Sequence, residues 1–343
     1  EIKGRDIICK AEISGQLKSA KGINVPNVIL KTKLVTEKDK QMIKFADKVS
    51  VDFVGISFVE SEKHVFAIRS LLDGSQIGIV SKIENAAGYE ARREIIEASD
   101  VIMIDRGDLS VETDLFDVVL KQKLIIRDAQ DLNTPVIVAT ELLHTMINNP
   151  VPTKAEVSDV TNAVIDGAAA LMLSGETAVG NYPKQSVTLM RKVADSAFES
   201  IRSINAGVER DADSIPDSIK KAVSLIAGER SITKIIVITK SGFAARRVAS
   251  LRPRQPILVV TNDEPSSRAL NILHGTESFY VNTSFDKFGT SHLSVCLKEL
   301  WMRKKISASD IVLVTCLVYP SEANRMNLIQ VHHVSDLEKS FNW

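Results

Sequence analysis

Residues 76–104 read QIGIVSKIENAAGYEARREIIEASDVIMI, and this stretch decides the fold class. Apolar runs at Gln76–Ser81 and Val101–Ile104 flank Gly88–Ala98, a segment with the apolar spacing of an amphipathic helix. Strands that are apolar on both faces and joined by a helix indicate a parallel sheet covered by helices. The stretch therefore predicts an α/β fold.

The same alternation continues on both sides of this stretch. Three further strands are predicted at Phe53–Phe58, Val136–Ala139 and Ala169–Leu173. Further helices are predicted at Ser61–Leu72, Phe116–Leu132, Lys154–Ile165 and Pro183–Ile201. An earlier helix is expected to start at Thr36, because Asp39 stands three residues later and completes a capping box.

A second unit comes after Asn205–Asp217, a segment rich in Asp, Ser and Gly that is typical of a linker. Its predicted helices are Ser218–Gly228, Phe243–Ser250, Ser266–Leu273 and Asp286–Met302. Its predicted strands are Lys234–Thr239, Pro256–Thr261, Ser278–Val281, Asp310–Thr315 and Leu328–Val334. This pattern predicts a smaller open α/β domain. The start of the chain differs, with an alternating strand expected at Ile7–Ser14 and a loop at Lys21–Pro26.

Composition excludes several classes of protein. The 343 residues suggest about two domains, and 44% hydrophobic with 25% charged residues is the balance of a soluble protein. Lys plus Arg and Asp plus Glu are both 43, which argues against nucleic acid or an anionic membrane as the main partner. The 3 cysteines are too few for a disulfide framework, so a reducing, cytoplasmic location is expected. The missing initiator Met predicts a chain cut from a longer protein.

The strongest chemical signal is Ser81-Lys82-Ile83-Glu84-Asn85, at the C-terminal end of a predicted strand. Lys82 and Glu84 are two residues apart, so they point to the same side of the strand. In α/β barrels this end of the strands carries the active site. An ammonium beside a carboxylate can hold a metal and a developing negative charge, although a simple salt bridge explains the pair equally well.

The next strand leads into Arg106-Gly107-Asp108-Leu109, which supplies a second carboxylate in a predicted loop. Carboxylates from the ends of adjacent parallel strands suit Mg²⁺, which also keeps places for substrate oxygens and water. Gly107 allows backbone N–H groups to approach an anion closely. The alternative is that Asp108 only caps the next helix.

Three other segments are weaker candidates. Thr140 ends a third strand, where its hydroxyl can donate to a substrate or serve the structure alone. Leu173–Thr177 is either an anion-binding loop or a helix start capped by Ser174. In the second unit Thr239-Lys240-Ser241-Gly242 leads into a helix, as a phosphate site or an ordinary strand–helix turn.

These segments, in this order, resemble the pyruvate kinase family over nearly the whole chain. The most specific matches are Lys21–Pro26, Ser81–Asn85, Glu97–Asp100, Arg106–Leu109, Val138–Leu143, Ala155–Val160 and Leu171–Thr177. The resemblance implies the C-terminal part of a (β/α)8 TIM barrel joined to a smaller open α/β C-terminal domain. It divides the chain into the end of an inserted lid domain (1–26), a partial catalytic barrel (27–202), a linker (203–217) and the C-terminal domain (218–343).

The resemblance also implies roles for individual residues. Lys82 looks like the lysine that stabilises the phosphoryl group in transit, and Glu84 and Asp108 look like the ligands of Mg²⁺ or Mn²⁺. The backbone at Gly107 and Asp108 looks like the cradle of the substrate carboxylate, and Thr140 like the hydroxyl near the enolate carbon. The implied substrates are phosphoenolpyruvate and ADP, giving pyruvate and ATP, in a cytoplasmic homotetramer. K⁺ is implied in the complete enzyme, with ligands on early strands that this chain lacks.

Several positions depart from the family pattern. Asp105 stands where the family usually has a small residue, and its carboxylate would repel an anionic substrate if it faced the site. Glu141 stands where many members have Gln. Thr239–Gly242 matches the start of the family's effector loop, but Phe243, Ala244 and the segment Val318–Glu322 do not match the rest of the effector site. Two rival functions remain open: a Mg²⁺-dependent enolate lyase or decarboxylase acting on pyruvate or oxaloacetate, and a non-catalytic regulatory paralogue.

Overall fold

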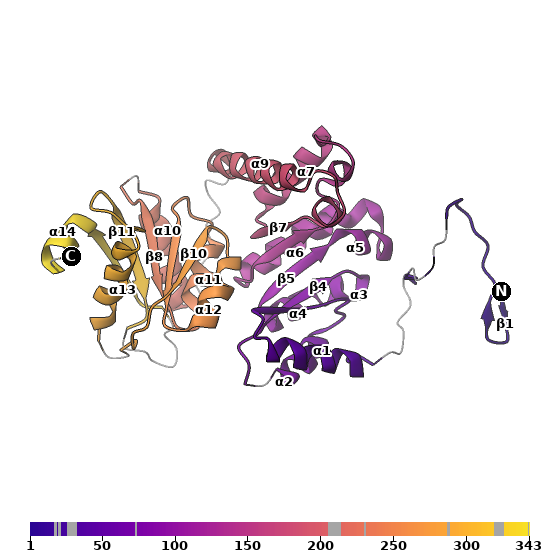
Figure 1. Ribbon diagram of the computed structural model, residues 1–343, viewed down its shortest axis with the longest axis horizontal. Coiled ribbons are helices and arrows are strands. Elements are labelled where there is room, and N and C mark those ends of the chain that lie inside the picture. The colour runs from indigo at the N-terminus through magenta and orange to yellow at the C-terminus, as the bar shows by residue number, and fades with distance from the viewer. Residues whose placement is uncertain are drawn as a thin grey trace.

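The computed structural model describes residues 1–16, 19, 22–25, 33–72, 74–204, 214–229, 231–286, 289–318, 326–341 and 343. Two five-stranded sheets, each flanked by helices, make up most of the described chain (Figure 1). The α/β class predicted from the sequence is confirmed.

The first sheet is parallel throughout, and its strands lie side by side in the order in which they occur in the chain. They are β3 (Phe53–Ile56), β4 (Gly78–Ile83), β5 (Val101–Asp105), β6 (Val136–Ala139) and β7 (Ala170–Met172). Because parallel crossovers are right-handed, an order without reversal places the connecting helices on one face. This is the arrangement of a barrel segment and not of a doubly wound sheet.

Helices cover one face of this sheet. They are α1 (Glu37–Lys48), α2 (Glu62–Leu71), α3 (Ala86–Glu90), α4 (Arg92–Ala98), α6 (Val118–Asp131), α7 (Lys154–Asp166) and α9 (Pro183–Ile204). The large buried cluster between sheet and helices includes Ile79 and Ile83 of β4. A separate small cluster contains Val80, Val101 and Ile137. Alternation along β4 puts Val80 on the face opposite Ile79, and we call that face the inner face.

The second sheet is mixed, with the order β10-β9-β8-β11-β12 and only β12 antiparallel. Its strands are β8 (Lys234–Ile238), β9 (Ile257–Thr261), β10 (Thr276–Tyr280), β11 (Ile311–Cys316) and β12 (Leu328–His333). Its helices are α10 (Ile215–Ala227), α11 (Phe243–Ser250), α12 (Glu264–Ala269), α13 (Ser291–Met302) and α14 (Val334–Phe341). Two apolar clusters pack against this sheet, as in an open, doubly wound domain.

The observed first residues of three helices can be compared with those predicted from the sequence. The capping box at the start of α1 is confirmed, because Thr36 accepts from the Asp39 N–H and Asp39 accepts from the Thr36 N–H. The first helix of the second unit begins at Ile215 and not at Ser218, since Ser214 caps it. The helix expected from Asp286 begins at Ser291.

The strand predicted at Ile7–Ser14 is wrong. The described N-terminal residues form only a short hairpin of β1 (Ile2–Lys3) and β2 (Asp6–Ile7). Ile8 still exchanges backbone hydrogen bonds with Glu1, but residues 9–14 are exposed and belong to no strand, so their alternating pattern has no buried face to satisfy. Lys21 and Pro26, residues 205–213 and the end of Val318–Glu322 lie outside the described residues.

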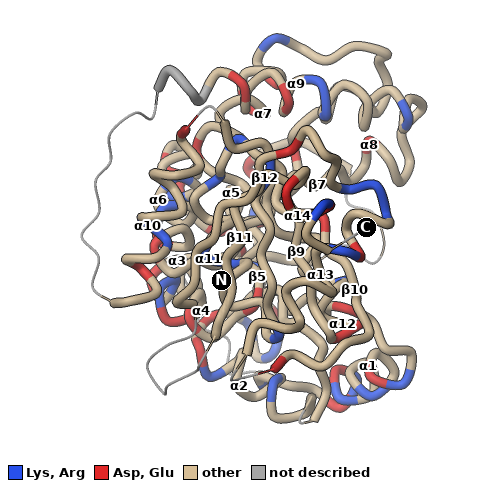
Figure 2. The backbone as a smooth tube through the Cα atoms, turned by 90° about the vertical axis from the view of Figure 1, so that its left-hand side faces the viewer, with Lys and Arg blue, Asp and Glu red and all other residues tan. Residues whose placement is uncertain are grey.

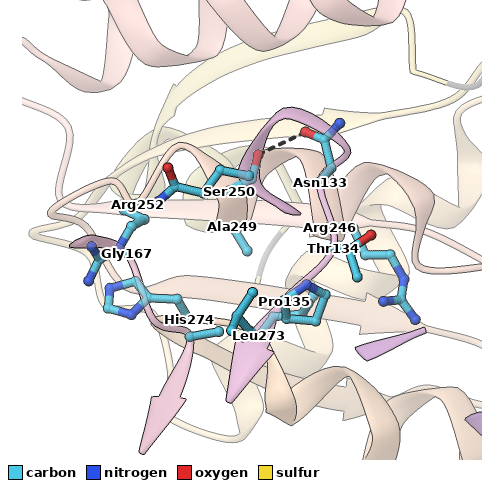
Figure 3. A pocket seen from close by; sticks show the side chains of 13 residues that line it. Asn133, Thr134, Pro135, Gly167, Arg246, Ala249, Ser250, Arg252, Leu273 and His274 are labelled. Carbon is cyan, nitrogen blue, oxygen red and sulfur yellow. Dashed lines mark hydrogen bonds between the residues drawn. The ribbon is translucent and has the colours of Figure 1, made fainter. Parts of the chain in front are cut away.

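Polar contacts join the two units. Asn133 Oδ1, just before β6, accepts from Ser250 Oγ at the end of α11 at 2.8 Å (Figure 3). Arg246 Nη1 donates to the backbone oxygen of Asp100 at 2.7 Å. A small cavity of about 30 Å³ lies between these contacts and His274. The second unit therefore packs against the N-terminal ends of strands in the first sheet.

Charges of both signs are interspersed along the chain, as Figure 2 shows for α1 and its neighbours. This agrees with the zero net charge of the sequence. Among the described helices, none combines the length and the apolarity needed to cross a bilayer.

Candidate active site

The C-terminal end of β4 brings a lysine and a glutamate into contact. Lys82 Nζ lies 2.5 Å from Glu84 Oε1. Glu84 is fully buried, whereas the Lys82 side chain is 22% exposed. Both residues follow the alternation of Val80, so they lie on the inner face, away from the helices. The prediction that Lys82 and Glu84 point the same way is confirmed.

Burial and charge oppose each other in this pair. Burial raises the pKa of the Glu84 carboxyl, and the contacts with Lys82 and the Phe58 N–H offset only part of that rise. Burial also lowers the pKa of Lys82, but hydrogen bonds and charge from Glu84 and Asp105 outweigh it and leave the pKa raised. Lys82 is therefore held as an ammonium.

A strained backbone holds the second oxygen of Glu84. Phe58, shortly after β3, has a φ of +52°, and its N–H donates to Glu84 Oε2 at 2.5 Å. A left-handed conformation costs a non-glycine residue about 1 to 2 kcal/mol. The preceding Ser57 accepts from Lys82 Nζ at 3.4 Å. Sequence reasoning missed Ser57 and Phe58, because nothing in the letters marks the backbone angle.

The segment predicted as a loop after β5 is helical. Helix α5 (Arg106–Glu112) begins directly after the strand, so Gly107 and Asp108 lie in its first turn. Leu109 is fully buried and anchors this turn to the core, which overrides the local turn signal of Gly-Asp. An acidic side chain in the first turn is favoured by the helix dipole.

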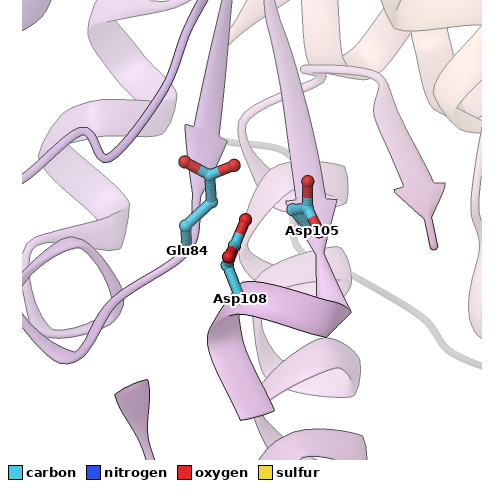
Figure 4. Close-up of side chains that lie close together, drawn as sticks. All are labelled: Glu84, Asp105 and Asp108. Atoms are coloured by element: carbon cyan, nitrogen blue, oxygen red, sulfur yellow. The ribbon is translucent and has the colours of Figure 1, made fainter. Parts of the chain in front are cut away.

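Three carboxylates meet on the inner side of the strand ends (Figure 4). One oxygen from each of Glu84, Asp105 and Asp108 lies within 4.8 Å of the others. The predicted pair, Glu84 and Asp108, is therefore brought together. Asp105 was noted only as a departure from the family pattern, and its carboxylate does face the site.

Asp105 contacts two of the predicted site residues. Its Oδ2 lies 3.2 Å from Lys82 Nζ, and its Oδ1 accepts from Thr140 Oγ1 at 3.2 Å. Asp105 is 7% exposed. Strand register accounts for this position: Lys82 pairs with Met103, so Asp105, two residues further along β5, extends on the same face.

Thr140 lies in a second strained turn. Thr140 and Glu141 have φ values of +66° and +53° directly after β6. Thr140 Oγ1 accepts a hydrogen bond from the Gly107 N–H at 2.8 Å, and the Thr140 hydroxyl donates its own hydrogen bond to Asp105 Oδ1. Thr140 and Lys82 thus share Asp105 as a partner, and the role of the Thr140 hydroxyl toward a substrate stays a prediction. The Gly107 N–H, expected to face a substrate carboxylate, is occupied by this hydroxyl.

Arg106 supports the turn and does not face the carboxylates. Its guanidinium donates to the backbone oxygens of Thr140 and Glu141 at distances of 2.7 to 3.2 Å. Its Nη1 also lies 2.6 Å from Asp159 Oδ2 on α7. Arg106 and Asp159 were missed as supporting residues, although both lie in motifs that carried the family resemblance.

Glu176 fixes the segment that comes after Thr140. It is 2% exposed and accepts from the backbone N–H groups of Leu143 and Ser174, both at 3.0 Å. A short helix, α8 (Gly175–Ala178), begins here, so the helix-start interpretation of Leu173–Thr177 holds. The Ser174 side chain makes no capping bond, and the Glu176 carboxylate instead accepts the Ser174 backbone N–H.

The predicted effector loop, Thr239–Gly242, belongs to the second sheet unit. Thr239 is buried, and its hydroxyl accepts from the Gly242 N–H at 3.1 Å. Gly242 has a φ of +78° and starts α11. Lys240 and Ser241 are exposed. The loop is ordered by its own hydrogen bond, and its binding of a phosphate stays a prediction.

The donor set at the strand ends fits a divalent cation. Mg²⁺ and Mn²⁺ prefer carboxylate oxygens and retain positions for water and substrate oxygens. Glu84 and Asp108, with Asp105 beside them, would hold such an ion. Lys82 adds a fixed positive charge at the same place, suited to an anionic substrate.

Two family models match the chain. A model described as "Pyruvate kinase, barrel domain" covers residues 1–187, and one described as "Pyruvate kinase, alpha/beta domain" covers residues 217–332. The predicted barrel segment and C-terminal α/β domain are thereby confirmed.

Curated relatives agree with these models. The chain is 38% identical to a pyruvate kinase of Geobacillus stearothermophilus, over 97% of this chain and 57% of that protein. It is 37% identical to a pyruvate kinase of Clostridium acetobutylicum, over 97% of this chain and 71% of that protein. It is also 37% identical to "Pyruvate kinase 2" of Synechocystis, over 96% of this chain and 56% of that protein. The chain thus spans little more than half the length of two of these three relatives.

Proposed function

Because the chain belongs to the pyruvate kinase family, we propose that the protein that carries it transfers a phosphoryl group from phosphoenolpyruvate to ADP. In this reaction the bond between phosphorus and the enol oxygen breaks, and a bond to an ADP phosphate oxygen forms. The enolate that remains takes a proton on carbon and becomes pyruvate.

One observation carries the proposal. The ammonium of Lys82 and the carboxylates of Glu84 and Asp108 meet at the C-terminal ends of neighbouring parallel strands. Phosphoryl transfer depends mainly on positioning and on neutralising charge. A lysine beside a carboxylate cation site supplies both functions in one place.

We assign a role to each residue of this site. Glu84 and Asp108 hold Mg²⁺ or Mn²⁺, which when bound neutralises charge on the substrate oxygens. Lys82 stabilises the phosphoryl group as it moves. Thr140 is positioned by the Gly107 N–H and by Asp105, which also contacts Lys82, and its hydroxyl orients the group that protonates the enolate. Gly107 and Asp108 would present their backbone to the substrate carboxylate once Thr140 yields the Gly107 N–H.

The wider assignment rests on the family. We propose a cytoplasmic homotetramer that uses K⁺ in addition to the divalent ion, and we assign no residue of this chain to K⁺. An exposed apolar strip on η1 (Leu115–Asp117) and α6 supports an oligomer, since Phe116 is 92% exposed and Leu120 59%. Large exposed apolar side chains that are grouped together mark protein interfaces.

A second activity is favoured by one observation. Asp105 contacts Lys82, where a phosphoryl oxygen would otherwise pair with the ammonium. A substrate without a phosphoryl group, such as oxaloacetate, meets less repulsion there than phosphoenolpyruvate. Release of CO₂ from oxaloacetate, measured with Mg²⁺ and without nucleotide, would support this lyase activity.

Replacing Lys82 tests the proposed function. Lys82→Met should lower phosphoryl transfer about 10²- to 10³-fold, because a preorganised charge at the developing anion is lost. Mn²⁺ binding, monitored by electron paramagnetic resonance, should be largely retained. Lys184→Met, at an exposed lysine of α9, is the matched control and should leave turnover unchanged. Comparable turnover in Lys82→Met and wild type would refute the role of Lys82.

A further inference from the structure

The side chain of Asp105 is built into the site by contacts on both of its oxygens. Lys82 approaches Oδ2, and the Thr140 hydroxyl donates to Oδ1. Asp105 is 7% exposed and ends β5, so its position is fixed by the sheet as well as by these partners. A carboxylate placed in this way is not a solvated surface charge.

The site therefore carries an excess of negative charge. Glu84, Asp105 and Asp108 with the single ammonium of Lys82 give the cluster a net charge of −2 when all are ionised. The neighbouring cation does not compensate, because Arg106 is directed to Asp159 and to backbone oxygens. Without Asp105 the same count would be −1.

We propose that Asp105 is a specificity-determining residue that makes anion binding at this site depend on prior binding of a divalent cation. This inference rests on the proposed function, because it concerns the same cation site. In the absence of a cation, Glu84 and Asp105 both contact the Lys82 ammonium, so an incoming anion has to displace a carboxylate from Lys82 and meets the negative charge of all three acids. With a divalent cation held by the three carboxylates, the cluster would have zero net charge, and Lys82 would then be available to pair with the anion.

The size of the effect depends on the position of the charge. The Asp105, Glu84 and Asp108 oxygens lie within 4.8 Å of one another, where charges in a partly buried site interact strongly. Removing one carboxylate should weaken binding of the cation and strengthen binding of the anion without a cation. Coupling between two ligands of one protein is commonly about 5- to 150-fold, and we expect Asp105 to contribute about tenfold.

Oxalate and Mn²⁺ are suitable probes. Oxalate is a planar dianion with two adjacent oxygens, like the enolate that the reaction leaves behind. Its dissociation constant would be measured by calorimetry without and with saturating Mn²⁺, and the ratio of the two is the coupling factor. Mn²⁺ affinity would be measured separately by electron paramagnetic resonance. Neither measurement requires turnover.

Asp105→Asn removes the charge and keeps the shape of the side chain. It should lower the coupling factor about tenfold, weaken Mn²⁺ binding and tighten oxalate binding in the absence of metal. Asp105→Ala, which removes the carboxylate altogether, should change these values in the same direction and provides a second variant if Asn disturbs folding. Asp114→Asn, at an exposed acid beyond α5, is the matched charge control and should change none of these values.

The outcomes separate this inference from the proposed function. An unchanged coupling factor in both folded Asp105 variants would overturn the inference. Glu84→Gln and Asp108→Asn test the cation site itself, and both should weaken Mn²⁺ binding more than Asp105→Asn does. If neither Glu84→Gln nor Asp108→Asn weakens Mn²⁺ binding, the proposed cation site is wrong. If both weaken Mn²⁺ binding while the Asp105 variants change neither Mn²⁺ binding nor the coupling factor, the cation site stands and only the role of Asp105 is rejected.

Discussion

Replacing Arg106 by methionine should destabilise the turn that carries Thr140. Methionine keeps most of the length and apolar surface of arginine but removes all of its donors. The backbone oxygens of Thr140 and Glu141 would then lose the guanidinium that holds them at positive φ, and Asp159 would lose its partner. The change therefore affects a strained turn and a partly buried carboxylate together.

The burial of each group sets the magnitude. The Arg106 side chain is 9% exposed, so removing it leaves two carbonyl groups without a charged donor. Breaking a buried ionic contact by deleting one partner costs about 3 to 5 kcal/mol. Asp159 is 31% exposed, so water recovers part of its loss, and we expect about 3 kcal/mol in total.

Chemical unfolding and hydrogen exchange would measure this cost. Urea unfolding gives the free energy, and exchange of the amides in residues 139–148 reports the turn itself. Asp159→Asn should cost only about 1 kcal/mol, because the carbonyl contacts of Arg106 survive. Arg93→Met is the control: its side chain is 52% exposed and makes one ion pair, with Asp128, so it should cost less than about 1 kcal/mol. An Arg106→Met variant as stable as Asp159→Asn, with unchanged exchange, would refute the reasoning.

Two further predictions concern the second unit. Gly242→Ala should lower the free energy of unfolding more than Gly275→Ala. Both glycines have positive φ, but only at Gly242 would a new Cβ meet a neighbour, Leu270 Cδ2 at 2.6 Å. Urea unfolding should show a loss of about 1 to 2 kcal/mol for Gly275→Ala and a larger loss for Gly242→Ala. Burial, assisted by the charge of Arg252, lowers the pKa of His274 to about 4 from its ordinary value of 6.5. The unfolded chain therefore takes up a proton first as the pH falls, so the stabilisation from neutral His274 is complete above pH 6.5 and is lost by about pH 4. Over this range the wild type should lose at most about 3 kcal/mol more than His274→Gln in urea unfolding, and equal pH profiles would contradict the buried state of His274.

The fold was predictable where buried strands and helices have a regular pattern of apolar residues. The strands of the first sheet are apolar on both faces, and the helices between them are amphipathic, so β6 was predicted with its observed bounds, Val136–Ala139. Prediction failed where tertiary contacts decide. Residues 9–14 continue an alternating pattern but form no strand, and α5 forms across Gly107-Asp108 because Leu109 is buried.

The sequence could predict those parts of the site that depend on the alternation of side chains along a single strand. Lys82 and Glu84 had to share a face, and Asp108 had to come after the neighbouring strand. The orientation of Asp105 depends on which residues pair across β4 and β5, and Lys82 opposite Met103 puts it on the same face. A single sequence does not contain this register, so the third carboxylate could be noted but not placed.

Two turns with a strained backbone lie at the functional end of the sheet. Phe58 lies after β3, and Thr140 and Glu141 lie after β6, and all three have positive φ without being glycine. Such conformations cost energy and persist where surrounding contacts fix them, which is common at active sites. Here the fixing contacts come from charged side chains: Glu84 accepts the Phe58 N–H, and Arg106 binds the oxygens of Thr140 and Glu141. Ser50, Asn133, Arg252 and Lys304 have similar positive φ values elsewhere, so strain alone does not locate the site. At Phe58 and Thr140 the strained turns lie at the same ends of the strands as Lys82, and the charged side chains of the site hold them there.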